Sequence, residues 1–196
     1  MPTWLWIVVA YLIGSVSFAV VVSKLFALPD PHSYGSGNPG ATNVLRTGNR
    51  AAAALTLLGD GAKGWLAVFL ARQFVPGIEP WLLAAVGLAV FIGHLFPVFH
   101  RFAGGKGVAT AAGILLAIDW RLAAVTLAVW LVLALTLKIS SVSSIAAAVA
   151  APIASFYFLG NQPVSWMLIV MTALLIWRHR GNIEKLLAGR ETTLGR

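Results

Sequence analysis

Apolar stretches separated by short polar loops run along almost the whole chain. A helix needs about 20 predominantly apolar residues to cross a bilayer, and seven stretches have this general character. They cover residues 4–25, 51–74, 81–99, 108–118, 122–137, 142–159 and 164–177. The stretch 108–118 is short, which predicts a helix that does not span fully or that its neighbours shield. We therefore predict an all-α, polytopic integral membrane helix bundle with about seven transmembrane helices.

The composition agrees with this fold class. Hydrophobic residues make up 59% of the 196 residues and charged residues 10%, against about 45–50% and about 25% in ordinary soluble domains. The apolar segments fill the chain, so we expect a single integral membrane domain over residues 1–196 and no separate catalytic module. The chain has no cysteine, which excludes thiol catalysis and thiolate metal sites.

The distribution of basic residues predicts how the chain is oriented. Fourteen Lys and Arg residues stand against six Asp and Glu residues, a formal charge of +8. Seven crossings divide the loops into two sets, of which one carries eleven basic residues and the other two, Arg72 and Arg121. Cytoplasmic loops are enriched in Lys and Arg, so we expect the N-terminus outside and the C-terminus in the cytoplasm. The eleven are Lys24, Arg46, Arg50, Arg101, Lys106, Lys138, Arg178, Arg180, Lys185, Arg190 and Arg196.

In this arrangement the polar segments all face the cytoplasm. They are residues 35–43, 104–107 and 140–144 and the tail from residue 179 onward. Chemistry on one side favours an enzyme over a carrier with a site at the membrane midplane. A transporter of organic phosphate anions and a purely structural membrane protein are the alternatives.

The run GSGNPGATN at residues 35–43, followed by Arg46, is the strongest candidate for chemistry. Three of its nine residues are glycine, so the backbone can adopt positive φ and aim several amide N–H groups at one anion. Hydroxyl, amide and guanidinium groups suit phosphate oxygens. An ordinary interhelical turn has a similar composition, but so dense a cluster beside membrane helices favours binding. The candidate residues are Ser36, Gly37, Asn38, Gly40, Thr42, Asn43 and Arg46.

A second candidate is the run GGKG at residues 104–107, directly before the expected helix at 108. Backbone amides at a helix N-terminus and the Lys106 ammonium can form a small phosphate cradle. The run lacks the spacing of a Walker motif, so no nucleotide is implied. The alternative is that Lys106 is only one of the positive charges that orient the chain in the membrane. The candidates here are Gly104, Gly105, Lys106 and Gly107.

A third candidate pair is His179 and Asn182, which lie three residues apart and so share a face of a helix. A basic flank that fixes orientation would explain the neighbouring arginines but not Asn182. Glu184 stands five residues after His179. On a continuous helix that offset points the two side chains apart, so we do not assign Glu184 as a carboxylate that orients the histidine.

Polar residues within the apolar stretches have two interpretations each. Asp60 and Lys63 are three residues apart and are expected to pair, either as functional groups or as a structural pair. His94 either orients the loop with GGKG at residues 104–107, called the second loop below, or is a buried histidine with satisfied hydrogen bonds. Ser141 and Ser144 share a helix face and either donate to a phosphate or cap a helix.

These motifs make the chain resemble the bacterial membrane glycerol-3-phosphate acyltransferases that use acyl phosphate as donor, the PlsY family. The resemblance covers nearly the whole chain, with several specific motifs in the right order. They are YLIGS at 11–15, GSGNPGATNVLR at 35–46, DGAKG at 60–64, GHLFPVF at 93–99, AGGKGVAT at 103–110, SSVSSI at 140–145 and HRGNIEKLLAGRE at 179–191.

The resemblance implies transfer of a fatty acyl group from acyl phosphate to the 1-hydroxyl of sn-glycerol 3-phosphate. The products are lysophosphatidic acid and inorganic phosphate, in the first acylation step of phospholipid synthesis. It also implies a multi-pass enzyme of the bacterial inner membrane with a cytoplasmic active site, which needs no coenzyme A, cofactor, metal or nucleic acid. By position, Arg46, Lys106, Ser144, His179 and Asn182 match the family's glycerol-3-phosphate and catalytic-pocket residues, and Ser36 with residues 37–43 matches its acyl-phosphate loop.

The chain has no nucleophile elbow and no convincing Ser-His-Asp set. We therefore expect direct attack by the glycerol hydroxyl without an acyl-enzyme, with the proton passing to a phosphate oxygen or to His179. Three positions depart from the family pattern. His32 stands where the family usually has Arg, Ser17 where it often has Pro, and Lys138 where it often has Arg. A phosphate contact at His32 would depend on pH.

Overall fold

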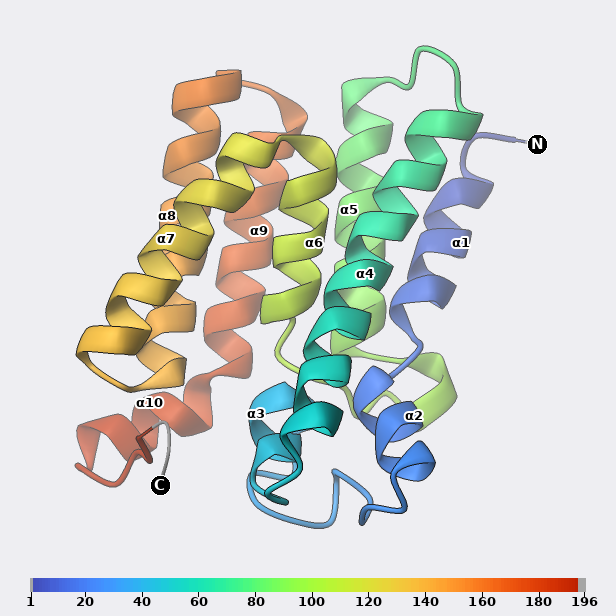
Figure 1. Ribbon diagram of the computed structural model, residues 1–196. Helices are drawn as coiled ribbons and strands as arrows, with labels where there is room; N and C mark the ends of the chain where they lie inside the picture. The colour runs from blue at the N-terminus through green and yellow to red at the C-terminus, as the bar shows by residue number, and fades with distance from the viewer. Residues whose placement is uncertain (1, 194–196) are drawn as a thin grey trace.

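The computed structural model describes residues 2–193, and within them it contains helices and no β-strand. Figure 1 shows the helices side by side in one bundle. The basic residue Arg196, expected on the cytoplasmic side, lies outside the described residues. The α-helices are α1 (Leu5–Gly14), α2 (Phe18–Leu25), α3 (Ala41–Leu45), α4 (Arg50–Phe74), α5 (Pro80–Leu95), α6 (Val108–Ile118), α7 (Trp120–Thr136), α8 (Ser140–Leu159), α9 (Pro163–Arg178) and α10 (Arg180–Leu187), and a 3₁₀ helix, η1, covers Val98–His100.

Local sequence signals start several of these helices. The side chain of Asn49 caps α4 by accepting a hydrogen bond from the N–H of Ala52 at 2.9 Å. Asp119 caps α7 in the same way. Pro80 and Pro163 open α5 and α9, where the missing N–H costs no helical hydrogen bond. The boundaries expected from the apolar pattern are therefore close to the observed ones for these helices.

The length and hydropathy of the helices agree with a membrane bundle. In the described part of the chain, α4, the segment Pro80–His100 and α8 are long and apolar enough to cross a membrane, and the bent pair α1–α2 is a fourth candidate span. Helices α6, α7 and α9 are apolar but shorter. The all-helical fold is confirmed, and the count of seven crossings stays a prediction.

The first apolar stretch is broken, although we expected one helix over residues 4–25. Helices α1 and α2 meet at a bend of 41°. The carbonyl oxygen of Val16, between the two helices, accepts a hydrogen bond of 2.6 Å from Nζ of Lys63 in α4. Ser15 Oγ accepts from the N–H of Val98 at 3.3 Å. Lys63 thus satisfies a backbone carbonyl at the break, which an apolar environment demands, and Ser15 in turn satisfies the backbone N–H of Val98.

Small residues let the helices approach closely. Helix α4 packs along α6, and α1 packs along α5. A Cβ atom on Gly113 of α6 would overlap the carbonyl oxygen of Gly61 in α4, and one on Gly64 would overlap the carbonyl oxygen of Thr110. Glycines at helix contacts bring backbones together in this way in membrane proteins. The close contact fixes α4 against α6, and the N-terminus of α6 follows the GGKG run.

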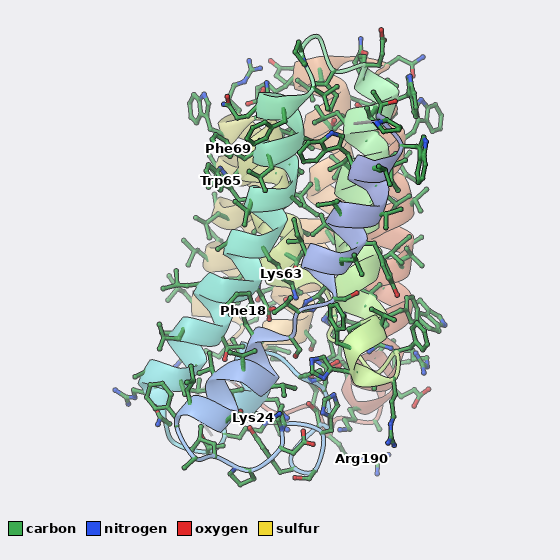
Figure 2. All side chains as sticks on the ribbon, turned by 90° about the vertical axis from the view of Figure 1, so that its right-hand side faces the viewer. Phe18, Lys24, Lys63, Trp65, Phe69 and Arg190 are labelled. Atoms are coloured by element: carbon green, nitrogen blue, oxygen red, sulfur yellow. The ribbon has the colours of Figure 1, made fainter. Side chains whose placement is uncertain are left out.

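The polar segments gather at one end of the bundle. In Figure 1 the loop before α3, the loop between η1 and α6, the turn between α7 and α8, and α10 all lie at the lower end. The N-terminal end of α1 lies at the opposite end. Figure 2 shows Lys24 and Arg190 at the polar end, Lys63 turned inward at mid-height, and Trp65 and Phe69 on the outer side of α4.

Replacing Gly113 by Ala should destabilise the bundle, because the added methyl group has no room against Gly61. Overpacking of this kind typically costs about 1–3 kcal/mol. We expect a lower thermal unfolding midpoint in detergent for Gly113→Ala. The matched control is Gly181→Ala in α10, where a Cβ meets nothing within 4 Å. Equal midpoints for the two variants would contradict the close packing of α4 on α6.

Candidate functional site

The loop at residues 35–43 folds around the side chain of Asn43 in α3. Asn43 is 3% exposed, and its Oδ1 accepts hydrogen bonds from the N–H of Ser36 at 3.0 Å and its hydroxyl at 3.3 Å. Its Nδ2 donates to the carbonyl oxygens of Pro31 at 2.8 Å and Tyr34 at 3.2 Å. In this structure Asn43 therefore shapes the loop from within.

The other residues of this loop line its surface. Ser36, Gly37 and Thr42 are exposed, and Asn38 and Gly40 are half-buried. The backbone of this loop has a positive φ at two glycines, 60° at Gly35 and 64° at Gly37. A Cβ on Gly35 would overlap Asn43 Oδ1 and come within 3.1 Å of the Arg46 side chain. Arg46 thus lies along the loop.

The GGKG run is held by hydrogen bonds to two other elements, α9 and α5. Arg178, the last residue of α9, donates from Nε to the carbonyl oxygen of Gly105 at 3.0 Å and from Nη2 to that of Gly104. The N–H of Gly105 donates to the carbonyl oxygen of His94 at 3.1 Å. Gly107 has a φ of 89° and precedes α6. Because a Cβ on Gly104 would overlap backbone carbonyls of α5, these glycines are needed for packing.

Lys106, Asn182 and Ser141 meet through a carboxylate that we did not predict. Nζ of Lys106 donates to Oδ1 of Asn182 at 2.5 Å. Nδ2 of Asn182 donates to Oε1 of Glu191 at 2.6 Å, and the hydroxyl of Ser141 donates to the same oxygen at 2.8 Å. The second loop, α8, α10 and the segment after α10 are joined in one hydrogen-bonded network. Three of the predicted site residues therefore belong to one cluster.

Arg46 reaches the same C-terminal segment. Its Nη2 donates to the hydroxyl of Thr192 at 3.2 Å. The positive charge of Arg46 also acts on Lys106 by lowering its pKa. The loop at residues 35–43, called the first loop below, therefore adjoins the Lys106 cluster through Arg46 and Thr192.

Burial lowers the pKa of Lys106 to about 8. The carboxylate of Glu191 opposes this change, and the charges of Arg46, Lys185 and Arg178 add to it. Lys106 is mostly protonated at neutral pH and loses its charge as pH rises through about 8. An ammonium has three N–H donors, so two remain for an anion when one is bonded to Asn182.

His179 sits at the junction of α9 and α10 and is 2% exposed. His179 is the N-cap residue of α10, so the continuous helix that we assumed when we set Glu184 aside does not run through residue 179. The His179 carbonyl instead accepts a hydrogen bond of 2.8 Å from the N–H of Asn182. This backbone hydrogen bond keeps His179 and Asn182 close together at the start of α10.

The ring of His179 has a defined tautomer. Its Nδ1 lies 2.8 Å from the carbonyl oxygen of Leu175, which can only accept, so Nδ1 carries the proton and Nε2 is an acceptor in the neutral ring. Burial lowers the pKa of His179 to about 4, and the charge of Lys106 acts in the same direction. At neutral pH the ring is uncharged and its Nε2 can accept a proton.

Ser141 and Ser144 do not cap α8, whose N-cap residue is Ile139. The capping alternative is therefore wrong for both. Ser144 Oγ donates to the carbonyl oxygen of Ser140 at 2.8 Å and accepts from Nε1 of Trp130 in α7 at 3.1 Å. Whereas Ser141 joins the Glu191 cluster, Ser144 contacts α7.

The expected pair of Asp60 and Lys63 is present in the interior of the bundle. Nζ of Lys63 lies 2.9 Å from Oδ1 of Asp60, and both side chains are buried. Nδ1 of His94 lies 3.6 Å from the same oxygen. Because the His94 carbonyl also holds Gly105, the pair is connected through α5 to the GGKG run. His94 is both buried and in contact with the second loop, so its two interpretations are compatible.

Two residues that shape the site were missed by the sequence analysis. Arg178 was interpreted as an orientation signal because it adjoins other basic residues, and Glu191 was treated as part of a polar tail. The signal for Glu191 was a carboxylate in a basic segment, where Glu184 is the other acidic residue. For metals, residues 2–193 contain no group of three or more His, Cys, Asp or Glu residues that could hold an ion.

Comparison with known proteins links this geometry to one family. The family model for glycerol-3-phosphate acyltransferase matches residues 4–189. A glycerol-3-phosphate acyltransferase from Cupriavidus taiwanensis is 62% identical over 197 residues, which cover 100% of this chain and 98% of the relative. One from Ralstonia nicotianae is 59% identical over 190 residues, covering 96% and 92%.

Two solved structures have the same fold. One is a crystal structure of PlsY (YgiH), an integral membrane glycerol 3-phosphate acyltransferase, in its glycerol 3-phosphate form, with a TM-score of 0.90. The other is its lysophosphatidic acid form, with a TM-score of 0.88. Each is 40% identical and covers 100% of this chain and 96% of its own. Family model, relatives and structures agree over nearly the full length, and the chain therefore belongs to the glycerol-3-phosphate acyltransferase family of integral membrane proteins.

Proposed function

We propose that this protein transfers a fatty acyl group from acyl phosphate to the 1-hydroxyl of sn-glycerol 3-phosphate. The products are 1-acyl-sn-glycerol 3-phosphate (lysophosphatidic acid) and inorganic phosphate, and coenzyme A takes no part. The observation that carries the proposal is the cluster of Lys106, Asn182, Ser141 and Glu191 beside Arg46. It offers cations and polar donors at one end of an apolar bundle to two substrates that both bear phosphate.

Arg46 and Lys106 bind the phosphate of glycerol 3-phosphate in this proposal. A guanidinium carries five N–H donors and an ammonium three. One bond from each is accounted for, to Thr192 and Asn182 respectively. The remaining donors suit phosphate oxygens, and their charges balance a dianion. Asn182 and Ser141 hold the geometry through Glu191.

The first loop binds the phosphate of the acyl donor. Ser36 and Thr42 present exposed hydroxyls and Asn38 an amide. The backbone turns at Gly40, whereas the N–H of Gly37 already donates to the carbonyl oxygen of Tyr34 at 2.9 Å. Such backbone concavities bind anions. Asn43 keeps the loop in shape. The acyl chain would lie among the apolar helices, where its burial from water is favourable.

Direct transfer fits the chemistry of these groups. The glycerol oxygen forms a bond to the acyl carbon, the bond from that carbon to the phosphate oxygen breaks, and phosphate departs. The hydroxyl proton passes to Nε2 of neutral His179 or to a phosphate oxygen. Acyl phosphate is already activated, so holding the two substrates together supplies much of the rate. The donors of the first loop, with the charge of the adjoining Arg46, stabilise the departing phosphate, and Ser144 supports the pocket from α8.

We place this site on the cytoplasmic side of the bacterial inner membrane. The pair α1–α2 and helices α4 to α9 make seven crossings, with the N-terminus outside and the C-terminus inside. Support comes from the basic residues at the polar end, because Lys and Arg are enriched in cytoplasmic loops. Helix α6 has 11 residues, about 16 Å, and contacts α4, α5 and α7, which shield it from lipid. Residues 1–196 then form a single domain.

Purified protein in detergent tests the proposed reaction. We expect glycerol 3-phosphate and acyl phosphate to give one phosphate per lysophosphatidic acid formed, and acyl-CoA to give no product. Product from acyl-CoA alone, ping-pong kinetics, or an acyl group trapped on Ser36 or Ser144 would contradict the proposal. Uptake of glycerol 3-phosphate into sealed vesicles without product would instead favour a transporter.

Replacing Lys106 by Ala should raise the KM for glycerol 3-phosphate at least about tenfold or abolish turnover, because a charge-assisted hydrogen bond is worth about 1.5–3 kcal/mol. The measurement is steady-state kinetics in both substrates. Lys24→Ala is the matched control, since it removes one exposed charge at the same end of the bundle. Equal effects of the two variants would rule out a direct phosphate contact at Lys106.

The pKa of Lys106 sets a second expectation. Its charge is present below about pH 8 and lost above it, so the KM for glycerol 3-phosphate should rise as pH increases above 8. In Lys106→Arg the guanidinium keeps its charge, and this rise should disappear, whatever the absolute KM. A rise that persists in Lys106→Arg would assign the effect to another group.

Changing Glu191 to Gln should move the same transition in a defined direction. The carboxylate raises the pKa of Lys106, so its loss should shift the rise in KM to lower pH. The pH profile of the variant, measured beside its unfolding midpoint, separates this effect from loss of folded protein. A shift to higher pH would contradict the contact through Asn182.

A further inference from the structure

The ring of His32 bridges the two loops of the proposed site. Its Nδ1 lies 2.7 Å from Oδ1 of Asp30 in its own segment, and its Nε2 lies 3.0 Å from the carbonyl oxygen of Ala103. A carboxylate and a carbonyl can only accept hydrogen bonds. Both ring nitrogens must therefore donate, which requires the protonated imidazolium. If the ring were turned by 180°, carbon atoms would take the places of the two nitrogens. Their distances to the two oxygens would then be well under the usual C···O separation of about 3.3 Å or more.

His32 connects the two proposed substrate-binding segments through its ring contact with Ala103 and its own place in the chain next to Pro31. Ala103 directly precedes Gly104 and the GGKG run. On the other side, Pro31 adjoins His32, and its carbonyl oxygen accepts from Nδ2 of Asn43 at 2.8 Å. Asn43 in turn holds Ser36. A short chain of contacts therefore runs from the second loop through His32 to the centre of the first loop.

Other charged groups surround this bridge. Asp30 belongs to the same segment and accepts hydrogen bonds from both the backbone and the ring of His32, which lower its pKa. His100 in η1 and Lys24 in α2 face it from neighbouring elements. His32 itself is partly exposed, with 28% of its side-chain surface accessible, so it can exchange protons with water.

We propose that His32 is a positioning residue whose protonated ring ties the first loop to the GGKG run and so aligns the two phosphate-binding segments. A neutral ring can donate from one nitrogen only, so one of its two contacts is lost as pH rises. Histidine changes charge between about pH 5 and 8. The tie is complete while the ring is protonated and weakens when the ring loses a proton. The kinetic consequence rests on the proposed function, whereas the protonation state does not.

Nitrogen NMR of histidine-labelled protein tests the tie without an enzymatic assay. The chain has four histidines, and the His32 signals are those missing from the spectrum of His32→Arg. We expect imidazolium signals for His32 at pH 5.5, with both ring nitrogens protonated, and a change to the neutral form at higher pH. A neutral ring at pH 5.5 in the folded protein would overturn the proposal even if the acyl transfer were confirmed.

Kinetics of three variants test the positioning role. In His32→Arg the side chain keeps its charge and its multiple donors at all these pH values, and in His32→Gln the charge is absent throughout. From pH 6 to pH 8 we expect the KM for glycerol 3-phosphate of the unchanged protein to rise about threefold relative to His32→Arg, as for the loss of one hydrogen bond. Titration of the substrate phosphate is common to both proteins and cancels in this ratio.

The controls separate His32 from its neighbours. His32→Gln should show the weaker KM at both pH values, and His100→Gln should keep the profile of the unchanged protein. A constant ratio between the unchanged protein and His32→Arg would overturn the positioning role, as would a flat profile in His100→Gln. If neither donor supports acyl transfer, the proposed function fails, and the NMR experiment still decides whether His32 forms the tie.

Discussion

The hydrogen bonds that converge on Glu191 hold the polar end of the molecule together. Its carboxylate accepts from Asn182 and Ser141, and Asn182 accepts from Lys106. These partners come from α8, α10 and the loop before α6, which are far apart in the sequence. Because hydrogen bonds to charged groups are stronger than neutral ones, one carboxylate can bring the three together. The position of the Lys106 ammonium, on which the proposed phosphate binding depends, follows from this contact.

The apolar bundle explains why this chemistry lies at one end. Within a bilayer, unsatisfied polar groups are costly, and the buried charged groups of α4 contact each other and neighbouring polar groups. Lys63 contacts both Asp60 and the Val16 carbonyl, and His94 connects this pair to the GGKG run. The interior polar groups are thus connected to the loops at the polar end. The exposed donors of the site remain at the surface, where phosphate head groups and an acyl chain in the bilayer can meet.

Hydropathy predicted the long helices closely but could not predict their interruptions. The helix expected over 51–74 runs from Arg50 to Phe74, whereas the one expected over 4–25 breaks where a lysine 47 residues away donates to its backbone. The break falls at Ser15, Val16 and Ser17, two serines within an otherwise apolar stretch, and a hydropathy window averages them with their apolar neighbours. Motif reasoning found Lys106 and Asn182 but missed Glu191, because a carboxylate in a basic tail suggests a solvated flank. Such partners are set by tertiary contacts that no local pattern encodes.

A structure determined with glycerol 3-phosphate bound would test the central claim most directly, namely that segments distant in the sequence form one receptacle for phosphate at the polar end of the bundle. We predict the phosphate within hydrogen-bonding distance of Nζ of Lys106 and the guanidinium of Arg46, with the 1-hydroxyl directed toward His179. A phosphate bound at the opposite end of the bundle, or one bound between the helices away from Lys106, would contradict this account.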